Sequence, residues 1–140
     1  MNEHATSLAV EHLFTMHLNL GNYAIMPSGP HGTRVFAPVL DGIVSGPRLH
    51  AKVLPGADWV TVRADGWSKL DVRLTLIADD GAVIAMAYQG VLGTGSERRP
   101  RVAPLFEAAH EKYTWLNNVQ AIGIGTPGKN QVSYEIYALA

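Results

Sequence analysis

The sequence predicts an all-β protein, a single antiparallel β-barrel domain over residues 1–140 with about eight to ten short strands and one short helical segment. Two observations predict this fold class. Apolar and polar residues alternate with a period of two along most of the chain, which is typical of strands. The dipeptides Asp65-Gly66 and Asp80-Gly81 each lie between alternating runs and indicate hairpins. Many short strands with little helix normally close into a barrel, because closure hides the sheet edges.

The first part of the chain contains several predicted strands separated by glycine and proline. Apolar residues recur at alternate positions from Leu8 to Leu18 and predict the first strand. Residues 33–40 predict a second strand, in which Pro38 marks an edge or a bend. Shorter strand candidates follow, up to the predicted turn "PGAD" at 55–58.

The central part of the chain predicts a three-stranded meander over residues 57–64, 67–78 and 82–91. A two-residue loop in the first hairpin would place Val60 opposite Asp71 and mix apolar with charged residues. A three-residue loop with a left-handed glycine separates the two kinds of residue onto opposite faces. Because a shift of one residue exchanges the faces, we expect the three-residue loop.

In that register the first hairpin has an aliphatic face and a charged face. The aliphatic face carries Val60, Val62, Leu70 and Val72, and the charged face carries Trp59, Thr61, Arg63, Asp71 and Arg73. The loop length of the second hairpin stays open. A two-residue loop there places Tyr88 opposite Arg73, whereas a three-residue loop places Tyr88 on the aliphatic face.

The last third of the chain combines a loop, a helix and a hairpin. Residues 92–104 are rich in glycine, proline and arginine and predict a long mobile loop. Residues 105–113 predict the short helix, with Pro104 near its start. Residues 119–125 and 131–139 predict the final hairpin.

Composition limits the functions that this chain can have. Only 16% of the residues are charged, against a usual ~25%, which predicts a homodimer or a higher homo-oligomer because less of the surface is polar. The net charge is -1 and no basic stripe is present, so nucleic-acid binding is not expected. The first residues contain neither a signal peptide pattern nor a membrane span, which predicts a cytoplasmic protein without a membrane partner.

The charged face of the first hairpin has two interpretations. It meets solvent, in which case Asp71 and Arg73 form a weak surface ion pair. Alternatively it lines the barrel lumen, in which case Arg73 and Arg63 hold an anionic group and Asp71 moves a proton as a general base. Tyr88 would then polarise a carbonyl group of the ligand.

Further candidates come from other parts of the sequence. The stretch "YTWLN" at 113–117 follows the predicted loop and helix and would suit a rim over a barrel mouth, where an amide can donate and accept hydrogen bonds. The candidate catalytic residues are Asp71, Arg73 and Tyr88, and the candidate ligand-binding residues are Arg34, Trp59, Arg63, Trp115 and Asn117.

No metal or cofactor is expected from the motifs. The chain contains six histidines, but none of them has the spacing of a metal-binding motif. The chain contains no cysteine, and no serine lies in the G-x-S-x-G pattern of a hydrolase nucleophile. Nucleophilic hydrolysis therefore has no candidate residue.

Four stretches of the sequence resemble one protein family. They are "SGPHGTR" at 28–34, "GIVSGPRL" at 42–49, the block at 54–90 that includes "GADWVTVRADG" and "KLDVRLTLIADDGA", and "WLN" at 115–117. Together they resemble the bacterial family known as domain of unknown function 3237. The resemblance implies a small β-barrel, and it implies no established reaction.

The sequence therefore predicts a barrel that binds a small carbonyl-bearing or aromatic metabolite. The chemistry that suits the candidate residues is cofactor-independent proton transfer, by an isomerase, a cyclase or a lyase. Two alternatives remain: a binding or carrier barrel without turnover, and a structural interaction module. The direction in which the charged face of residues 69–75 points separates these possibilities.

Overall fold

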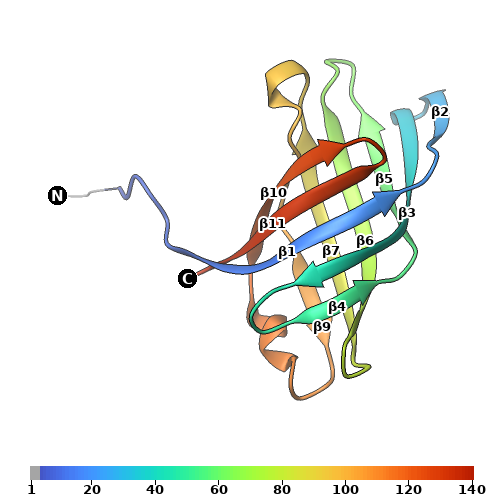
Figure 1. The fold of residues 1–140 in the computed structure, drawn as a ribbon. Coiled ribbons are helices and arrows are strands. Elements are labelled where there is room, and N and C mark those ends of the chain that lie inside the picture. Colours follow the sequence, from blue (N-terminus) through green and yellow to red (C-terminus); the bar gives the residue numbers. More distant parts are fainter. Residues whose placement is uncertain (1–3) are drawn as a thin grey trace.

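The computed structural model describes residues 4–140, which form eleven β-strands and two 3-10 helices (Figure 1). The strands are β1 (Val10–Leu20), β2 (Ala24–Gly29), β3 (Gly32–Ser45), β4 (His50–Val53), β5 (Gly56–Val62), β6 (Ser68–Ala78), β7 (Val83–Leu92), β8 (Arg101–Val102), β9 (Leu105–Ala108), β10 (Ala121–Gly128) and β11 (Gln131–Leu139). The 3-10 helices are η1 (Gly95–Glu97) and η2 (Thr114–Asn118). The predicted all-β class is confirmed, with slightly more strands than expected.

Eight of the strands form a closed antiparallel ring in the described part of the chain. Their order around the ring is β1, β3, β5, β6, β7, β8, β10 and β11, and β11 pairs with β1 to close it. Of the other strands, β2 pairs with β3, β4 lies between β3 and β6, and β9 pairs with β7. A barrel of this size has an interior that side chains fill or that holds one small ligand.

The turn between β5 and β6 has the three-residue form that the sequence predicts. The backbone N–H of Arg63 donates to the carbonyl oxygen of Trp67 at 2.8 Å, and the N–H of Gly66 donates to the carbonyl oxygen of Arg63 at 3.0 Å. Gly66 has φ +88°, which lies in the left-handed region that favours glycine. The resulting register places Asp58 opposite Val72, as this loop length requires.

The turn between β6 and β7, whose length the sequence left open, also has three residues. The backbone N–H of Ala78 donates to the carbonyl oxygen of Ala82 at 2.9 Å, and Gly81 has φ +89°. Tyr88 therefore lies opposite Val72 on the aliphatic face, and Arg73 lies opposite Ala87.

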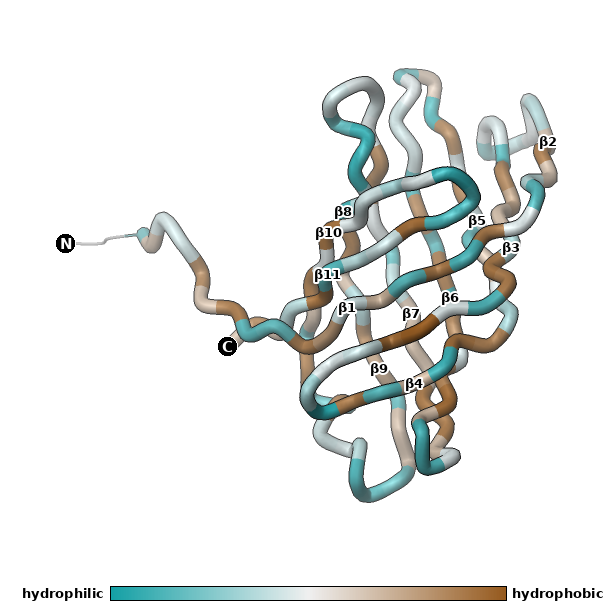
Figure 2. The backbone as a smooth tube through the Cα atoms, viewed as in Figure 1, coloured by the Kyte–Doolittle hydropathy of each residue, from teal (hydrophilic) through white to brown (hydrophobic). Residues whose placement is uncertain are grey.

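The aliphatic face of these strands forms the interior of the barrel. Along β6, Leu70, Val72, Leu74 and Leu76 are buried, while Lys69, Asp71 and Arg73 are exposed. Figure 2 shows the corresponding succession of hydrophobic and hydrophilic residues along the strands of the wall. Large side chains fill one end of the interior, and among the most buried are Phe14, Met16, Leu76, Ile84, Met86, Leu116 and Ile136. The other end, which the β5–β6 turn borders, is left more open.

The prediction of a helix at residues 105–113 is wrong. Residues 105–108 form β9, in which Phe106 and Ala108 are buried and Leu105 and Glu107 are exposed, and this strand pairs with β7. The short helical segment lies further along the chain, at η2. A free edge of β7 offered backbone hydrogen bonds to this short apolar stretch, and the pairing outweighed its local helical preference.

The loop predicted at 92–104 is also shorter than expected. Arg101–Val102 form β8, which pairs with both β7 and β10 and completes the ring. Ahead of β8, the chain turns through η1. The predicted mobility therefore applies to the turn around η1, where it stays a prediction.

Candidate functional site

The charged face of β6 lies on the outside of the barrel. Asp71 and Arg73 are exposed, and their neighbours Leu70 and Val72 point into the interior. The expectation that Asp71 and Arg73 line the lumen is wrong, because the aliphatic residues of the same strand fill the interior instead. On the outer wall the two residues border a separate pocket next to Trp59.

Three candidate ligand-binding residues also lie on the outer wall. Trp59 is 54% exposed. Arg63 is exposed and forms an ion pair with Asp65 next to the first turn, with 3.1 Å between Arg63 Nε and Asp65 Oδ1. Arg34 lies opposite Thr61 in the β3–β5 pairing, which places it on the same outer face. None of these candidates contacts the interior.

Trp115 and Asn117 lie at the filled end of the barrel. The guanidinium of Arg48 lies 3.6 Å from the centre of the Trp115 ring. The side chain of Asn117 accepts a hydrogen bond from the N–H of Ala108 at 2.7 Å and donates one to the carbonyl oxygen of Ala108 at 2.8 Å. The expected rim over the barrel mouth is therefore wrong for Asn117, which instead holds η2 against β9. Trp115 borders a separate pocket together with Arg48 and Tyr113.

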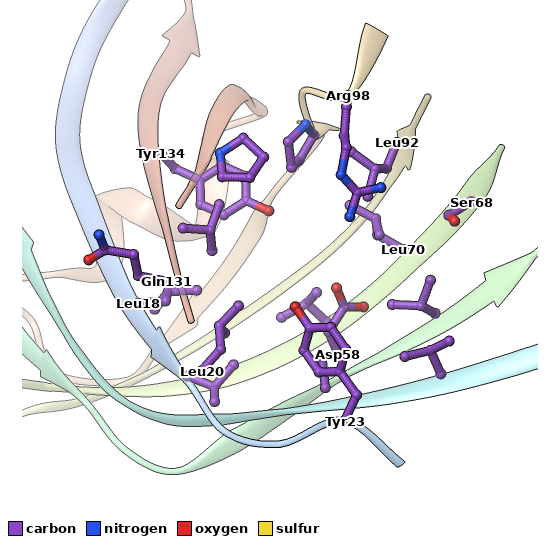
Figure 3. A pocket seen from close by; sticks show the side chains of 18 of the residues that line it. Leu18, Leu20, Tyr23, Asp58, Ser68, Leu70, Leu92, Arg98, Gln131 and Tyr134 are labelled. Carbon is purple, nitrogen blue, oxygen red and sulfur yellow. The ribbon is translucent and has the colours of Figure 1, made fainter. Parts of the chain in front are cut away.

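The open end of the interior encloses a cavity of about 380 Å³ (Figure 3). This volume lies in the range of roughly 300–1,000 Å³ that is typical of small-molecule sites. Most of the wall is apolar, with Leu18, Leu20, Ile25, Val35, Ala37, Val39, Val60, Val62, Leu70, Val72, Leu92 and Val132 among the lining residues. The polar lining residues are Tyr23, Asp58, Ser68, Tyr88, Arg98, Gln131 and Tyr134. Tyr88 is thus the one sequence-based candidate that lines this cavity.

Asp58 on β5 supplies the carboxylate of the cavity. Its Oδ1 accepts a hydrogen bond from the backbone N–H of Asp71 at 3.2 Å. Burial raises the pKa of Asp58 from 3.8 to about 6, the Asp71 N–H opposes this rise, and the nearby Asp71 charge adds to it. A carboxyl group with this pKa exchanges a proton readily near neutral pH, which suits a general acid or base.

Two tyrosines lie close to Asp58 in the interior. The rings of Tyr88 on β7 and Tyr134 on β11 pack edge to face, with 5.6 Å between their centroids. Burial raises the pKa of both phenols above the usual value, and the charge of Asp58 raises it further. Both phenols therefore keep their protons at neutral pH and remain hydrogen-bond donors.

The register that the sequence itself favours could have identified Asp58. A three-residue loop at the first turn places Asp58 opposite Val72 and on the same face as Val60 and Leu70. A carboxylate on an otherwise aliphatic face is unusual, because burying a charge costs free energy. Such a residue is a candidate for function when its pKa is shifted. Arg98 carried no comparable signal, since it lies in a turn without periodicity.

Residues 4–140 lack two features that would indicate a metal site or a membrane-spanning helix. They contain no group of three or more histidine, aspartate, glutamate or cysteine side chains that could hold a metal ion. No helix in the same range is long and apolar enough to cross a membrane.

The sequence matches one protein family over nearly its whole length. That family is described as "Protein of unknown function (DUF3237)", and the match covers residues 8–139. The chain belongs to the DUF3237 family. The family resemblance noted in four stretches of the sequence is thereby confirmed.

Relatives of this DUF3237 protein include one with an enzymatic name. The chain is 32% identical over 128 residues to the hydroalkoxylation enzyme phnH of Penicillium herquei. The aligned region covers 91% of this chain and 80% of that protein. It is 27% identical over 147 residues to a UPF0311 protein of Rhodopseudomonas palustris, covering 94% and 96% of the two chains.

Solved structures share the fold of this DUF3237 protein. An enzyme from Penicillium herquei superposes with a TM-score of 0.79 at 28% identity, covering 100% of both chains. A protein of unknown function from Clostridium acetobutylicum has a TM-score of 0.89 at 25% identity, covering 96% of this chain and 100% of the other. A β-barrel-like protein from Acinetobacter baumannii, at 24% identity and a TM-score of 0.87, covers 99% of this chain and 100% of the other, and shows the fold alone.

Proposed function

We propose that this DUF3237 protein is an enzyme that adds an O–H group across a C=C bond of a small, largely apolar molecule bound in the barrel cavity. An intramolecular addition of this kind closes a cyclic ether, and the reverse reaction is an elimination. The single observation that carries the proposal is Asp58, a carboxylate with a raised pKa in a largely apolar cavity. The relative named a hydroalkoxylation enzyme supports this choice among proton-transfer reactions.

Asp58 can serve both proton transfers that this addition needs. In its protonated form it donates a proton to one alkene carbon while the substrate oxygen forms a bond to the other carbon. The proton that the oxygen loses returns to the Asp58 carboxylate, so the carboxyl group is regenerated and the reaction is balanced without an oxidant or a reductant. A pKa of about 6 keeps both forms of Asp58 accessible near neutral pH.

The rest of the cavity supports the same chemistry. Tyr88 and Tyr134 line the cavity, and their hydroxyl groups would donate hydrogen bonds to an oxygen of the ligand and so polarise a conjugated carbonyl group. A ligand that fills this largely aliphatic cavity would displace water, which would otherwise compete with the substrate oxygen for the electrophilic carbon.

One alternative function keeps the same cavity without turnover. The predominance of apolar side chains over a few polar groups also suits a carrier that releases its ligand unchanged. Such a carrier would bind alkenyl phenols and would leave their C=C bonds intact.

A set of 2-alkenylphenols tests the proposal. The protein is incubated with each compound, and chiral chromatography measures the cyclic ether, of which we expect one enantiomer in excess. Asp58→Asn should abolish the enantiomeric excess, because the amide keeps the shape and the hydrogen bond from Asp71 N–H but cannot transfer a proton. Asp71→Asn, which changes an exposed carboxylate on the next strand, should retain turnover.

Each outcome of this experiment has a defined meaning. Equal turnover by Asp58→Asn and the parent protein would contradict the role of Asp58. Loss of turnover in Asp71→Asn alone would restore the assignment made from the sequence. Binding of the compounds with no product in any variant would favour the carrier.

A further inference from the structure

A cationic side chain reaches the cavity from the turn around η1. Arg98 follows η1 directly and is among the residues that line the cavity, whereas the adjacent Arg99 is not. Figure 3 shows the guanidinium of Arg98 pointing into the cavity from the side that faces Asp58. The lining of the cavity therefore contains one acidic side chain, Asp58, and one basic side chain, Arg98.

The turn that carries Arg98 is held together by its own hydrogen bonds. The N–H of Gly93 donates to the carbonyl oxygen of Glu97 at 3.0 Å, and the N–H of Arg98 donates to the carbonyl oxygen of Gly95 at 3.2 Å. A cationic group on a closed turn needs less ordering to bind a ligand than one on a free chain end.

The acidic residue of this turn is already paired with another arginine. Glu97 forms an ion pair with Arg101, which lowers the pKa of the Glu97 carboxyl group. Among residues 4–140, no carboxylate forms an ion pair with Arg98. The guanidinium of Arg98 therefore presents its N–H donors to whatever enters the cavity.

We infer that the natural ligand carries a carboxylate, which Arg98 binds at the mouth of the cavity while the apolar alkenyl part of the ligand extends to Asp58. A planar guanidinium binds a carboxylate with two parallel hydrogen bonds, which no other side chain of this cavity can offer. The ionised form of Asp58 repels an anion and the guanidinium of Arg98 attracts one. The two charges therefore favour the orientation with the carboxylate at Arg98 over the reverse orientation. The position of the alkene rests on the proposed function, whereas the selection of an acid does not.

Two probes of nearly the same shape, one anionic and one neutral, test this inference. They are 3-prenyl-4-hydroxybenzoate and its primary amide, and their affinities are measured by isothermal titration calorimetry at pH 7.5. We expect the parent protein to bind the carboxylate about tenfold or more tightly than the amide, as a hydrogen-bonded charge pair requires. Arg98→Met should bind the two probes equally and should keep the affinity of the parent protein for the amide.

The neighbouring arginine provides the matched control. Arg99→Met removes the same charge from the same turn, and we expect it to keep the preference for the carboxylate. Arg98→Lys keeps the charge but loses the two-pronged geometry, so it should keep part of the preference. Unchanged affinity for the amide shows that each variant is folded. If Arg98→Met does not fold, the preference for the carboxylate in Arg98→Lys tests the role of Arg98.

The outcomes separate this inference from the proposed function. Equal affinities in the parent protein, no binding of either probe, or a preference that survives in both Arg98 variants would each overturn the inference. A preference for the carboxylate that depends on Arg98, without any cyclic product, would support the inference while contradicting the proposed enzyme. Asp58→Asn should lose turnover and keep the preference for the acid.

Discussion

Replacing Asp58 with asparagine should stabilise the protein at neutral pH and not at acidic pH. The pKa of Asp58 rises from 3.8 to about 6 when the chain folds, mainly because of burial. A difference of one between folded and unfolded pKa corresponds to ~1.4 kcal/mol, so the ionised carboxylate costs the fold about 3 kcal/mol at pH 7. Asparagine has the same shape, accepts the same hydrogen bond from Asp71 N–H, and carries no charge.

The direction of this pH dependence follows from the number of protons that each state binds. Between about pH 4 and pH 6, the folded state holds the Asp58 proton that the unfolded state has lost, so the free energy of unfolding contributed by Asp58 falls as pH rises through this window. Well below pH 4 the carboxyl group is protonated in both states, and the cost disappears. The advantage of Asp58→Asn should therefore grow from about 0.5 kcal/mol at pH 4 to about 3 kcal/mol at pH 7.

Urea denaturation of both proteins at half-unit steps from pH 4 to pH 8 measures this difference, and other titrating groups cancel between them. Asp79→Asn, a change at an exposed carboxylate in the second turn, is the matched control and should show no such pH dependence. A difference between Asp58→Asn and the parent that stays constant with pH, or a loss of stability at pH 7, would refute the reasoning. A more stable but inactive Asp58→Asn would agree with a site in which function is maintained at the expense of stability.

The remaining predictions concern the outer wall, the η1 turn and association. Arg73→Met and Asp71→Asn should each cost less than ~1 kcal/mol in urea denaturation because both side chains are exposed, and a loss of 3 kcal/mol or more would place them in a buried pair after all. Trypsin should cut first after Arg98, because the bond after Arg99 precedes Pro100 and trypsin does not cleave before proline. The bond after Arg101 should resist because it lies within β8, and early cleavage there would contradict the strand. Sedimentation at micromolar concentration should give a mass above the 15.1 kDa of one chain, because charge is sparse and large apolar side chains are exposed on β7, β9 and β10; a clean monomer would end this expectation.

Local sequence determined the hairpins of this protein and the two faces of its central strands. The Asp-Gly pairs at residues 65–66 and 80–81 favour turns with a left-handed glycine, and the alternation around the first turn allowed only one register to separate apolar from charged residues. These signals act between neighbours along the chain, so they can be interpreted without knowledge of the rest of the fold. The family resemblance independently implied a small β-barrel, in agreement with the strands that the alternation predicts.

Only the tertiary structure decided which face of the strands became the interior. The sequence separated the face of Asp71 and Arg73 from the face of Val60 and Val72, yet it did not show which of them a closed ring would bury. Burial of aliphatic side chains dominates the free energy of such a small core, so the aliphatic face turned inward and carried Asp58 with it.

The same long-range closure assembled the rest of the site. Tyr134 meets Tyr88 because β11 pairs with β1 on one side and with β10 on the other, and Arg98 reaches the cavity because β8 completes the ring beside it. The pairing of β8 and β9 with β7 also replaced a predicted loop and helix with strands. Contacts between segments so distant in sequence leave no periodic pattern in either segment alone, because each depends on an edge that another part of the chain provides.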